Sequence, residues 1–156
     1  TTVQSKSGHA FIKDVMREHN AVYGGEMSAH HYFRDFAYCD SGMIPWLLAV
    51  SVLSETGQSL SSLVEDMIAK FPCSGEINFK VADTQVTIQK IFDHFADQNP
   101  VIDQTDGVSL DFGIWRLNVR ASNTEPLLRL NIESKERKNP EPIQVYVDQL
   151  TQLIQV

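Results

Sequence analysis

The sequence predicts an α+β protein in which residues 73–156 form a four-stranded, mostly antiparallel sheet with two helices on one face, preceded by an incomplete α/β domain remnant at residues 1–72. Two observations predict this. In the second half, apolar residues alternate with polar ones in four segments, and two further segments repeat apolar residues at helical spacing. The first half supplies helices but only one clear strand, which is too little sheet to cover its most apolar helix.

Three helices and one short strand are predicted in the first half. Apolar residues at helical spacing between Phe11 and Met16 predict the first helix, and Ala21 to Tyr23 predicts a brief strand. The segment from Met43 to Leu53 predicts a helix that is apolar almost all round, so it needs cover on several sides. Ser59 is placed to cap a third helix, which Pro72 stops.

The second half predicts the order β-α-β-β-β-α. The four strands are expected around residues 77–81, 108–112, 115–119 and 128–132. The two helices are expected around residues 84–95 and 143–154, where apolar residues recur every three or four positions. Asp106-Gly107 is a turn signal before the second strand. Such an order makes a two-layer domain with both helices on the apolar face of the sheet.

Composition and charge exclude several classes of function. With 156 residues, 42% of them apolar and 21% charged, the chain has the composition of an ordinary soluble globular protein. Its longest apolar run is far shorter than the roughly 20 residues that span a bilayer, so no membrane partner is expected. The net charge of −7 argues against nucleic-acid binding. Two cysteines, Cys39 and Cys73, are too few for a disulfide framework and fit a reducing cytoplasm.

The densest polar cluster is the segment from Arg120 to Pro126, between the last two predicted strands. It offers a guanidinium, two hydroxyls and a side-chain amide from Arg120, Ser122, Asn123 and Thr124. An arginine fork, short polar side chains and backbone N–H groups in a turn together suit a dianionic phosphate. The alternative is a plain hairpin loop, because Ser, Asn and Thr are common turn residues.

A second cluster follows the Gly24-Gly25 pair. In an extended loop, Glu26, Ser28 and His30 would point the same way and offer hydrogen-bonding groups and an imidazole to a polyol. The alternative is a loop at a strand end in which His30 only caps a neighbouring element. A zinc site built from His30, His31, Cys39 and Asp40 is a weak third interpretation, because adjacent histidine side chains diverge and no spacing matches a zinc motif. No metal ligand is therefore assigned.

A third cluster, Lys6-Ser7-Gly8-His9, precedes the first helix. A Gly-His turn at a helix N-terminus favours an anion or hydroxyl ligand, but this feature is common and nonspecific by itself. The sequence has no phosphate-binding Walker loop, no Gly-x-Ser-x-Gly and no evident nucleophile beside a base. These clusters therefore predict binding groups without the groups that would carry out a reaction.

Three motifs in this order connect the chain to a known family. They are Ser-Gly-His-Ala-Phe-Ile-Lys at 7–13, Gly-Glu-Met-Ser-Ala-His at 25–30 and Arg-Ala-Ser-Asn-Thr-Glu-Pro at 120–126. Their order and spacing resemble the α-D-phosphohexomutases, and within that family the bacterial phosphomannomutase branch. The resemblance covers nearly the whole chain, with one small departure at Ala29, where relatives often have Gly.

The resemblance implies a fold and a set of site residues. In the family, four domains surround a deep cleft, and this chain is similar to the end of domain three followed by all of domain four. It implies that domain three recognises the sugar and domain four holds the phosphate that is not transferred. The residues implied to bind substrate are His9, Glu26, Ser28, His30, Arg120, Ser122, Asn123 and Thr124. His30 is also implied to lie near the reacting oxygen, as a candidate general acid or base.

The resemblance implies an isomerase of carbohydrate metabolism that interconverts mannose 6-phosphate and mannose 1-phosphate by intramolecular phosphotransfer. A glucose or mannose 1,6-bisphosphate is its intermediate and activator, and Mg²⁺ is held by a domain absent here. The expected partners are the phosphosugar and the missing N-terminal domains, and we expect the fragment to bind no cofactor and to be inactive alone. The alternatives are a phosphoglucomutase, a dual-specificity phosphohexomutase or a noncatalytic phosphosugar-binding module.

Overall fold

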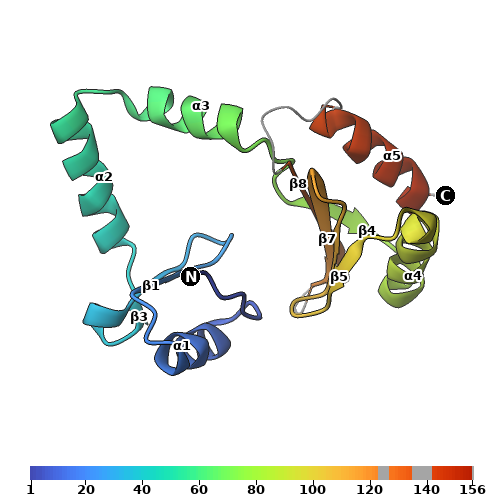
Figure 1. Cartoon of the computed structure of the whole chain (residues 1–156), viewed down its shortest axis with the longest axis horizontal. Helices are drawn as coiled ribbons and strands as arrows, with labels where there is room; N and C mark the ends of the chain where they lie inside the picture. The colour runs from blue at the N-terminus through green and yellow to red at the C-terminus, as the bar shows by residue number, and fades with distance from the viewer. Residues whose placement is uncertain (123–126, 135–141, 156) are drawn as a thin grey trace. The chain divides into compact units, whose positions relative to one another are not determined.

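The computed structural model describes residues 1–122, 127–134 and 142–155. The chain divides into two compact units, Thr1–Leu63 and Val64–Val156 (Figure 1). The first unit is built on helices and very short strands, and the second on one larger sheet. Each unit is described by itself.

The first unit contains a small antiparallel sheet with strand order β1-β2-β3. Its elements are α1 (His9–Glu18), β1 (Tyr23–Gly25), β2 (His31–Phe33), the 3₁₀ helix η1 (Arg34–Phe36), β3 (Cys39–Asp40) and α2 (Met43–Thr56). The prediction of one strand at Ala21–Tyr23 is wrong, because the unit has three strands and the first begins at Tyr23. Strands of two or three residues are too short to show alternation in the sequence.

Helix α1 packs on this sheet through a small apolar core. Ile12 and Met16, one helical turn apart, are buried against the ring of Tyr32 on β2. Ala21 and Tyr38 close the sides of the cluster. The packing fixes α1, and with it the segment just before α1, beside the hairpin that β1 and β2 form.

The predicted apolar helix is confirmed as α2, which ends where Gly57 adopts a left-handed φ of 66°. None of its residues is buried, and Trp46 is 57% exposed. Helix α3 (Leu60–Lys70) follows, and the Ser59 hydroxyl accepts a hydrogen bond from the Ser62 N–H at 3.2 Å, as the predicted cap requires. Within the described ranges, no helix is both long enough and apolar enough to cross a bilayer.

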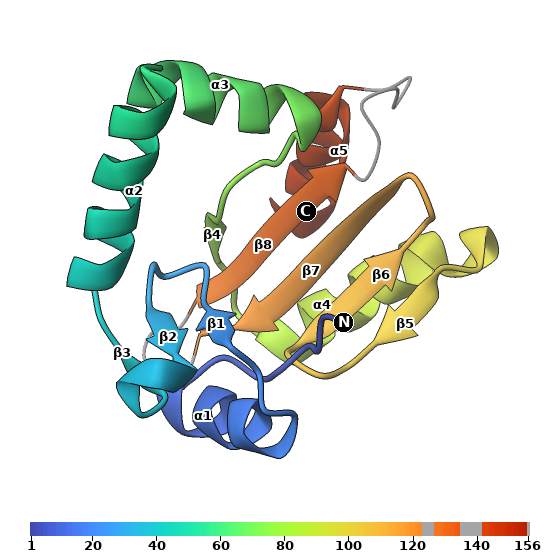
Figure 2. The ribbon, with the colours of Figure 1, turned by 60° about the vertical axis from the view of Figure 1, so that its left-hand side comes forward.

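The second unit is an antiparallel sheet of five strands in the order β4-β8-β7-β6-β5 (Figure 2). Its elements are β4 (Ile77–Lys80), α4 (Thr84–Phe95), the 3₁₀ helix η2 (Ala96–Gln98), β5 (Val101–Asp103), β6 (Val108–Asp111), β7 (Trp115–Ala121), β8 (Leu127–Ser134) and α5 (Ile143–Gln155). The predicted α+β class and antiparallel sheet are confirmed, but the sheet has five strands rather than four. The missed strand, β5, is a three-residue edge strand with Val101 73% exposed, so it carries no alternating pattern.

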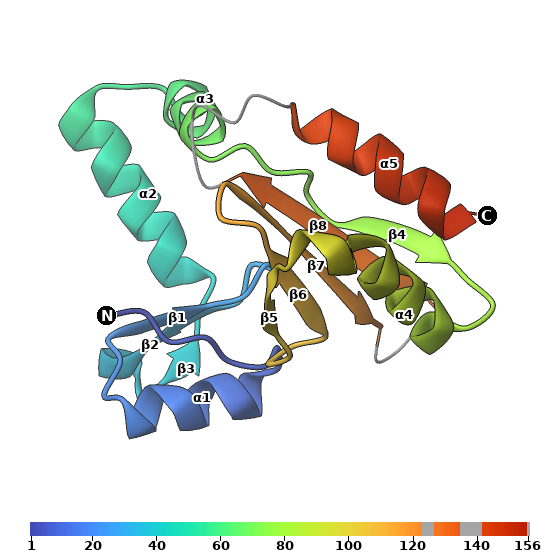
Figure 3. The same ribbon diagram turned by 45° about the vertical axis from the view of Figure 1, so that its right-hand side comes forward.

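Helices α4 and α5 cover one face of this sheet (Figures 1 and 3). Alternate residues of the strands meet the apolar stripes of both helices in one core. Its fully buried members include Phe95 of α4, Leu117 and Val119 of β7, Leu128 of β8 and Leu150 of α5. The side chains at the intervening positions of β7 and β8 therefore lie on the opposite, polar face.

The hairpin of β7 and β8 sets the positions of two arginines. Its register pairs Arg120 with Arg129 and Val119 with Leu130. Directly paired residues in an antiparallel ladder project from the same face, and Val119 and Leu130 are in the core. Arg120 and Arg129 therefore stand side by side on the polar face, at the end of the hairpin next to residues 122–126.

Candidate functional site

The segment from Glu26 to His30 is a tight turn and not the extended loop that the sequence predicted. The Glu26 N–H donates to the His30 carbonyl at 2.9 Å, which closes the hairpin between β1 and β2. Ala29 has a left-handed φ of 64°. Because the chain turns here, the alternation expected for Glu26, Ser28 and His30 does not apply, and each side chain has its own surroundings.

The Glu26 carboxylate ties the hairpin to the segment before α1. One oxygen accepts a hydrogen bond from the Tyr32 hydroxyl at 2.5 Å, and the other accepts from the Gly8 N–H at 3.2 Å. Burial, and then the neighbouring carboxylate of Glu26, raise the pKa of Tyr32 well above its usual range, so it is a permanent donor. The structure thus brings two sequence-predicted clusters together, with His9 at the start of α1.

His30 and His31 take different partners. The Nδ1 atom of His30 lies 3.0 Å from a carboxylate oxygen of Asp40, whereas Nδ1 of His31 lies 2.6 Å from the Tyr23 hydroxyl. The hydrogen bond with His30 lowers the pKa of Asp40 below its ordinary value. In residues 1–122, 127–134 and 142–155, no three His, Cys, Asp or Glu side chains are grouped so that they could hold a metal ion.

The second cluster of predicted residues lies on the polar face of the β7–β8 hairpin. Glu76, just before β4, stands between the two arginines, with one carboxylate oxygen 3.5 Å from Nη2 of Arg120 and 3.6 Å from Nη1 of Arg129. Nη2 of Arg129 also donates to the Ser122 hydroxyl at 3.3 Å. The Ser122 N–H donates to the Leu127 carbonyl at 2.8 Å. Ser122 and Arg120 are therefore linked through Arg129 and Glu76.

The charges of this arginine pair favour an anion. The side chains of Arg120 and Arg129 are only 19% and 24% exposed, and the Glu76 carboxylate lies between them. Two guanidiniums are thus held close together in a partly desolvated place, within a chain of net charge −7. Arginine forks are also the donors that match a phosphate geometrically.

The sequence did not predict Glu76, Arg129 or Tyr32 as residues that hold these sites together, and it indicated Asp40 only as a weak zinc ligand. Arg129 could have been found, because a hairpin that turns over residues 122–127 pairs position 120 with position 129. Glu76, Tyr32 and Asp40 make contacts between different segments of the chain, which no local sequence pattern predicts. Of the predicted residues, Asn123 and Thr124 lie outside the described residues.

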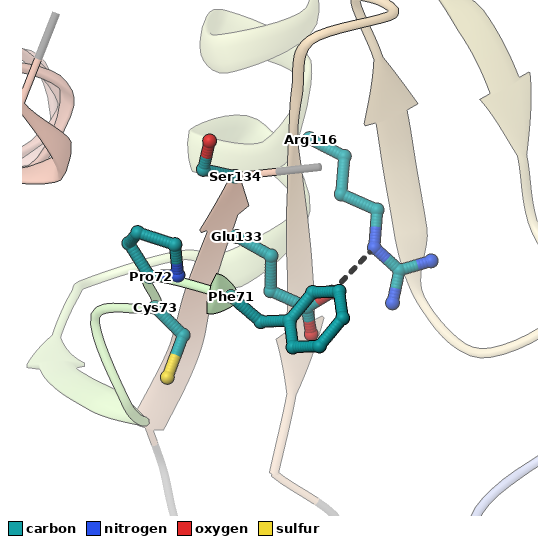
Figure 4. Close-up of a pocket in the computed structure, with 6 residues that line it drawn as sticks. All are labelled: Phe71, Pro72, Cys73, Arg116, Glu133 and Ser134. Atoms are coloured by element: carbon teal, nitrogen blue, oxygen red, sulfur yellow. Dashed lines mark hydrogen bonds and ion pairs between the residues drawn. The ribbon is translucent and has the colours of Figure 1, made fainter. Parts of the chain in front are cut away.

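A separate pocket of about 500 Å³ lies within the second unit (Figure 4). It is lined by Phe71, Pro72, Cys73, Arg116, Glu133 and Ser134. The Arg116 Nε–H donates to Glu133 at 2.8 Å, so these charges satisfy one another, and the other walls are mainly apolar. Of the sequence-predicted site residues that the structure describes, none lines this pocket.

Comparison with protein families identifies both halves of the chain. Residues 1–71 match the family model described as "Phosphoglucomutase/phosphomannomutase, alpha/beta/alpha domain III". Residues 76–150 match "Phosphoglucomutase/phosphomannomutase, C-terminal domain". The chain belongs to the phosphoglucomutase/phosphomannomutase family. The resemblance that the three motifs suggested is thereby confirmed.

Curated members of the phosphoglucomutase/phosphomannomutase family are similar to the chain over most of its length. "Phosphohexose mutases" from Xanthomonas campestris pv. campestris is 64% identical over 85% of the chain and 30% of the relative. "Phosphomannomutase" from Vibrio cholerae serotype O1 is 54% identical over 97% of the chain and 33% of the relative. The chain thus spans about a third of the length of the curated relatives that it matches.

A solved structure shows the same fold. The X-ray structure of a phosphoglucomutase/phosphomannomutase family protein from Burkholderia thailandensis matches with a TM-score of 0.66. The match covers 96% of this chain and 31% of that one, at 22% sequence identity. The α+β architecture predicted from the sequence is therefore that of a known family member.

Proposed function

We propose that this chain is the C-terminal portion of a phosphomannomutase that interconverts mannose 6-phosphate and mannose 1-phosphate through a sugar 1,6-bisphosphate. Residues 1–72 supply groups for the sugar hydroxyls, and residues 73–156 hold a phosphate. Relatives named phosphomannomutase, from Vibrio cholerae and Salmonella montevideo, support the proposal at 54% and 58% identity.

The arginine pair carries the phosphate-binding part of this proposal. Arg120 and Arg129 come from paired positions of one hairpin and both lie against the Glu76 carboxylate, so two guanidiniums are held side by side. Phosphoryl transfer depends on in-line positioning and charge stabilisation, and holding the phosphate that is not transferred supplies much of the positioning. Donors aimed at phosphate rather than at the ring accept the sugar in either orientation.

The remaining residues are given the roles that family membership implies. Ser122, with Asn123 and Thr124, completes the phosphate clamp in this proposal. Glu26 and Ser28 contact sugar hydroxyls, with Glu26 held in place by Tyr32 and Gly8. His9 borders the sugar, and His30 is the candidate general acid or base. Vicinal hydroxyls are good donors to a carboxylate, which suits Glu26.

The chain alone is proposed to be inactive as a mutase. By family analogy, the N-terminal domains of the parent carry a phosphoserine that donates the phosphoryl group and a loop that binds Mg²⁺. We place the parent in the cytoplasm, and the fragment itself binds no cofactor. A coupled assay with mannose 1-phosphate and a 1,6-bisphosphate activator should show no turnover by the purified chain. Turnover above that of an identically purified blank extract would contradict this proposal.

Phosphosugar binding is tested by titrating the ¹⁵N-labelled chain with mannose 1-phosphate. At millimolar ligand, we expect the amide signals of residues 122–124 to shift. Arg120→Ala and Arg129→Ala should each weaken binding by about tenfold or more, because a lost charge-assisted hydrogen bond costs about 1.5–3 kcal/mol. No shift in the unmodified chain, or shifts in both variants as large as those in the unmodified chain, would overturn the proposed phosphate site.

The matched control is Arg116→Ala. Arg116 lies on β7, four positions before Arg120 and on the same face, but it pairs with Glu133. The variant removes the same charge from the same strand, so it should bind mannose 1-phosphate as the unmodified chain does. A comparable loss in this control would mean that the net charge, and not the arginine pair, determines binding.

A dual-specificity phosphohexomutase is the second candidate function. The relative named "Phosphohexose mutases" is 64% identical, which favours a wider choice of sugar. Repeating the titration with glucose 1-phosphate separates the candidates. Equal shifts of the residue 122–124 amides and of the Glu26 and Ser28 signals would support dual specificity, whereas shifts at Glu26 and Ser28 with mannose 1-phosphate alone would support the phosphomannomutase.

A further inference from the structure

The sheet of the first unit places a carboxylate beside His30. Strand β3 pairs with β2 so that Asp40 lies opposite Tyr32, and the Ser41 N–H donates to the His31 carbonyl at 2.9 Å. These backbone bonds fix the end of β3 next to the residue that closes the β1–β2 turn. Asp40 therefore reaches His30 from a strand whose backbone is hydrogen-bonded to β2.

The contact defines which imidazole nitrogen carries the proton. The Asp40 carboxylate accepts hydrogen bonds but cannot donate them, so Nδ1 of His30, 3.0 Å away, must be the donor. In a neutral imidazole only one nitrogen bears a proton. With Nδ1 protonated, Nε2 is left as the acceptor, and the His30 side chain is 55% exposed, so the ring is accessible to a ligand.

We infer that Asp40 is a positioning residue, which holds the His30 imidazole in the tautomer that leaves Nε2 unprotonated and able to accept a proton from a sugar hydroxyl. The tautomer follows from the contact between His30 and Asp40, whereas the transfer of a proton from a sugar hydroxyl to Nε2 rests on the proposed function. In the step itself, Nε2 would take the hydroxyl proton as that oxygen forms its bond to phosphorus, while the bond from phosphorus to the serine oxygen of the parent's phosphoserine breaks and that oxygen leaves with the electron pair. The Nδ1 proton would stay on His30, hydrogen-bonded to Asp40.

Other charged and titratable groups near the dyad favour the same arrangement. Lys13 on α1 acts on Asp40 through its positive charge, and Tyr32 lies across from Asp40 with its hydroxyl bonded to Glu26. The pKa of Asp40 is lowered, mainly by the hydrogen bond with His30, so the carboxylate is ionised throughout the range in which imidazole titrates. Asp40 can therefore act as an acceptor at every pH at which His30 is neutral.

The test is a ¹⁵N NMR measurement of the histidine ring nitrogens in the intact 156-residue chain, at about pH 8, where an ordinary imidazole is neutral. In the unmodified chain, Nδ1 of His30 should give the signal of a protonated nitrogen and Nε2 that of an unprotonated one. Asp40→Ala should shift both signals toward the intermediate values of an unconstrained imidazole. Asp40→Glu, which keeps an acceptor, should restore part of the difference.

Asp35→Ala is the matched control, because Asp35 is an exposed aspartate of the same unit that pairs with Arg34 and not with a histidine. It should leave the His30 signals unchanged, and unchanged Tyr32 and Ile12 signals in Asp40→Ala would show that the fold is intact. Equal Nδ1 and Nε2 signals in the unmodified chain, or no change in Asp40→Ala, would overturn the assignment. The tautomer is measured without ligand, so failed phosphosugar binding would overturn the proposed function separately.

Discussion

Replacing Phe95 with alanine is expected to destabilise the second unit by about 3–5 kcal/mol, the usual cost of removing a buried phenylalanine side chain. Phe95 is 1% exposed, and its ring contacts Phe112 and Trp115 with centroid distances of 5.2 and 5.8 Å. The side chain comes from α4 and fills the space between that helix and the sheet. Its loss leaves a cavity that a β-sheet cannot collapse to fill.

Val86→Ala is the control for Phe95→Ala, because Val86 belongs to the same helix but is 64% exposed. That variant should change stability by less than about 0.5 kcal/mol. Urea unfolding followed by Trp115 fluorescence, in a Trp46→Phe background, measures both variants. Similar losses in the two would contradict the prediction that the packing of the Phe95 ring stabilises this unit.

Replacing Gly107 with alanine should cost about 2–5 kcal/mol, from a left-handed backbone together with overpacking. Gly107 has a φ of 70°, and a Cβ atom there would lie 2.4 Å from the Val119 carbonyl oxygen and 2.5 Å from Cβ of Arg120. Neither the strand backbone nor a Cβ atom can rotate away. Strand β6 must therefore separate from β7 beside Arg120, so the variant should also weaken the binding of mannose 1-phosphate.

Gly75→Ala separates the cost of the left-handed backbone from the cost of the steric overlap. Gly75 has a φ of 67°, almost the same as that of Gly107, but an added Cβ would meet nothing within 4 Å. Gly75→Ala should therefore destabilise the unit by about 1–2 kcal/mol, which is the cost of the left-handed conformation alone. The difference between the two variants in urea unfolding gives the cost of the steric overlap alone. Equal losses would show that Gly107 is needed for its φ and not for the close approach of Arg120.

The parts of the fold that the sequence predicted are those with a local periodic signal. Strand β7 alternates buried and half-buried residues from Trp115 to Arg120, and the caps of α3 and α4 are made by Ser59 and Asp83 as single side chains. Strands β2, β3 and β5 have two or three residues each and depend on pairing with a neighbour. Their stability comes from tertiary hydrogen bonds, which leave no period in the sequence.

The candidate site likewise contains residues that a local sequence pattern predicts and residues that only tertiary contacts bring in. Arg120 and Ser122 were predictable because phosphate donors are grouped in one short segment. Their partners Glu76 and Arg129 lie 44 and 7 positions away in sequence from the groups they contact. For the sugar cluster, the sequence predicted an extended loop between Glu26 and His30, whereas the structure has a turn there with Ala29 left-handed. Alternation is lost at such a turn, so sequence spacing alone could not assign the side-chain partners.

The register of the β7–β8 hairpin has a consequence for how related sequences can diverge. Arg120 and Arg129 meet because they form one register pair of the ladder, with Val119 and Leu130 forming the adjacent pair in the core. Insertions between positions 122 and 127 would lengthen the connection and leave both guanidiniums in place. A single deletion inside either strand would turn that strand's arginine toward the helices. Length variation among homologues should therefore concentrate in the connection and spare the two strands.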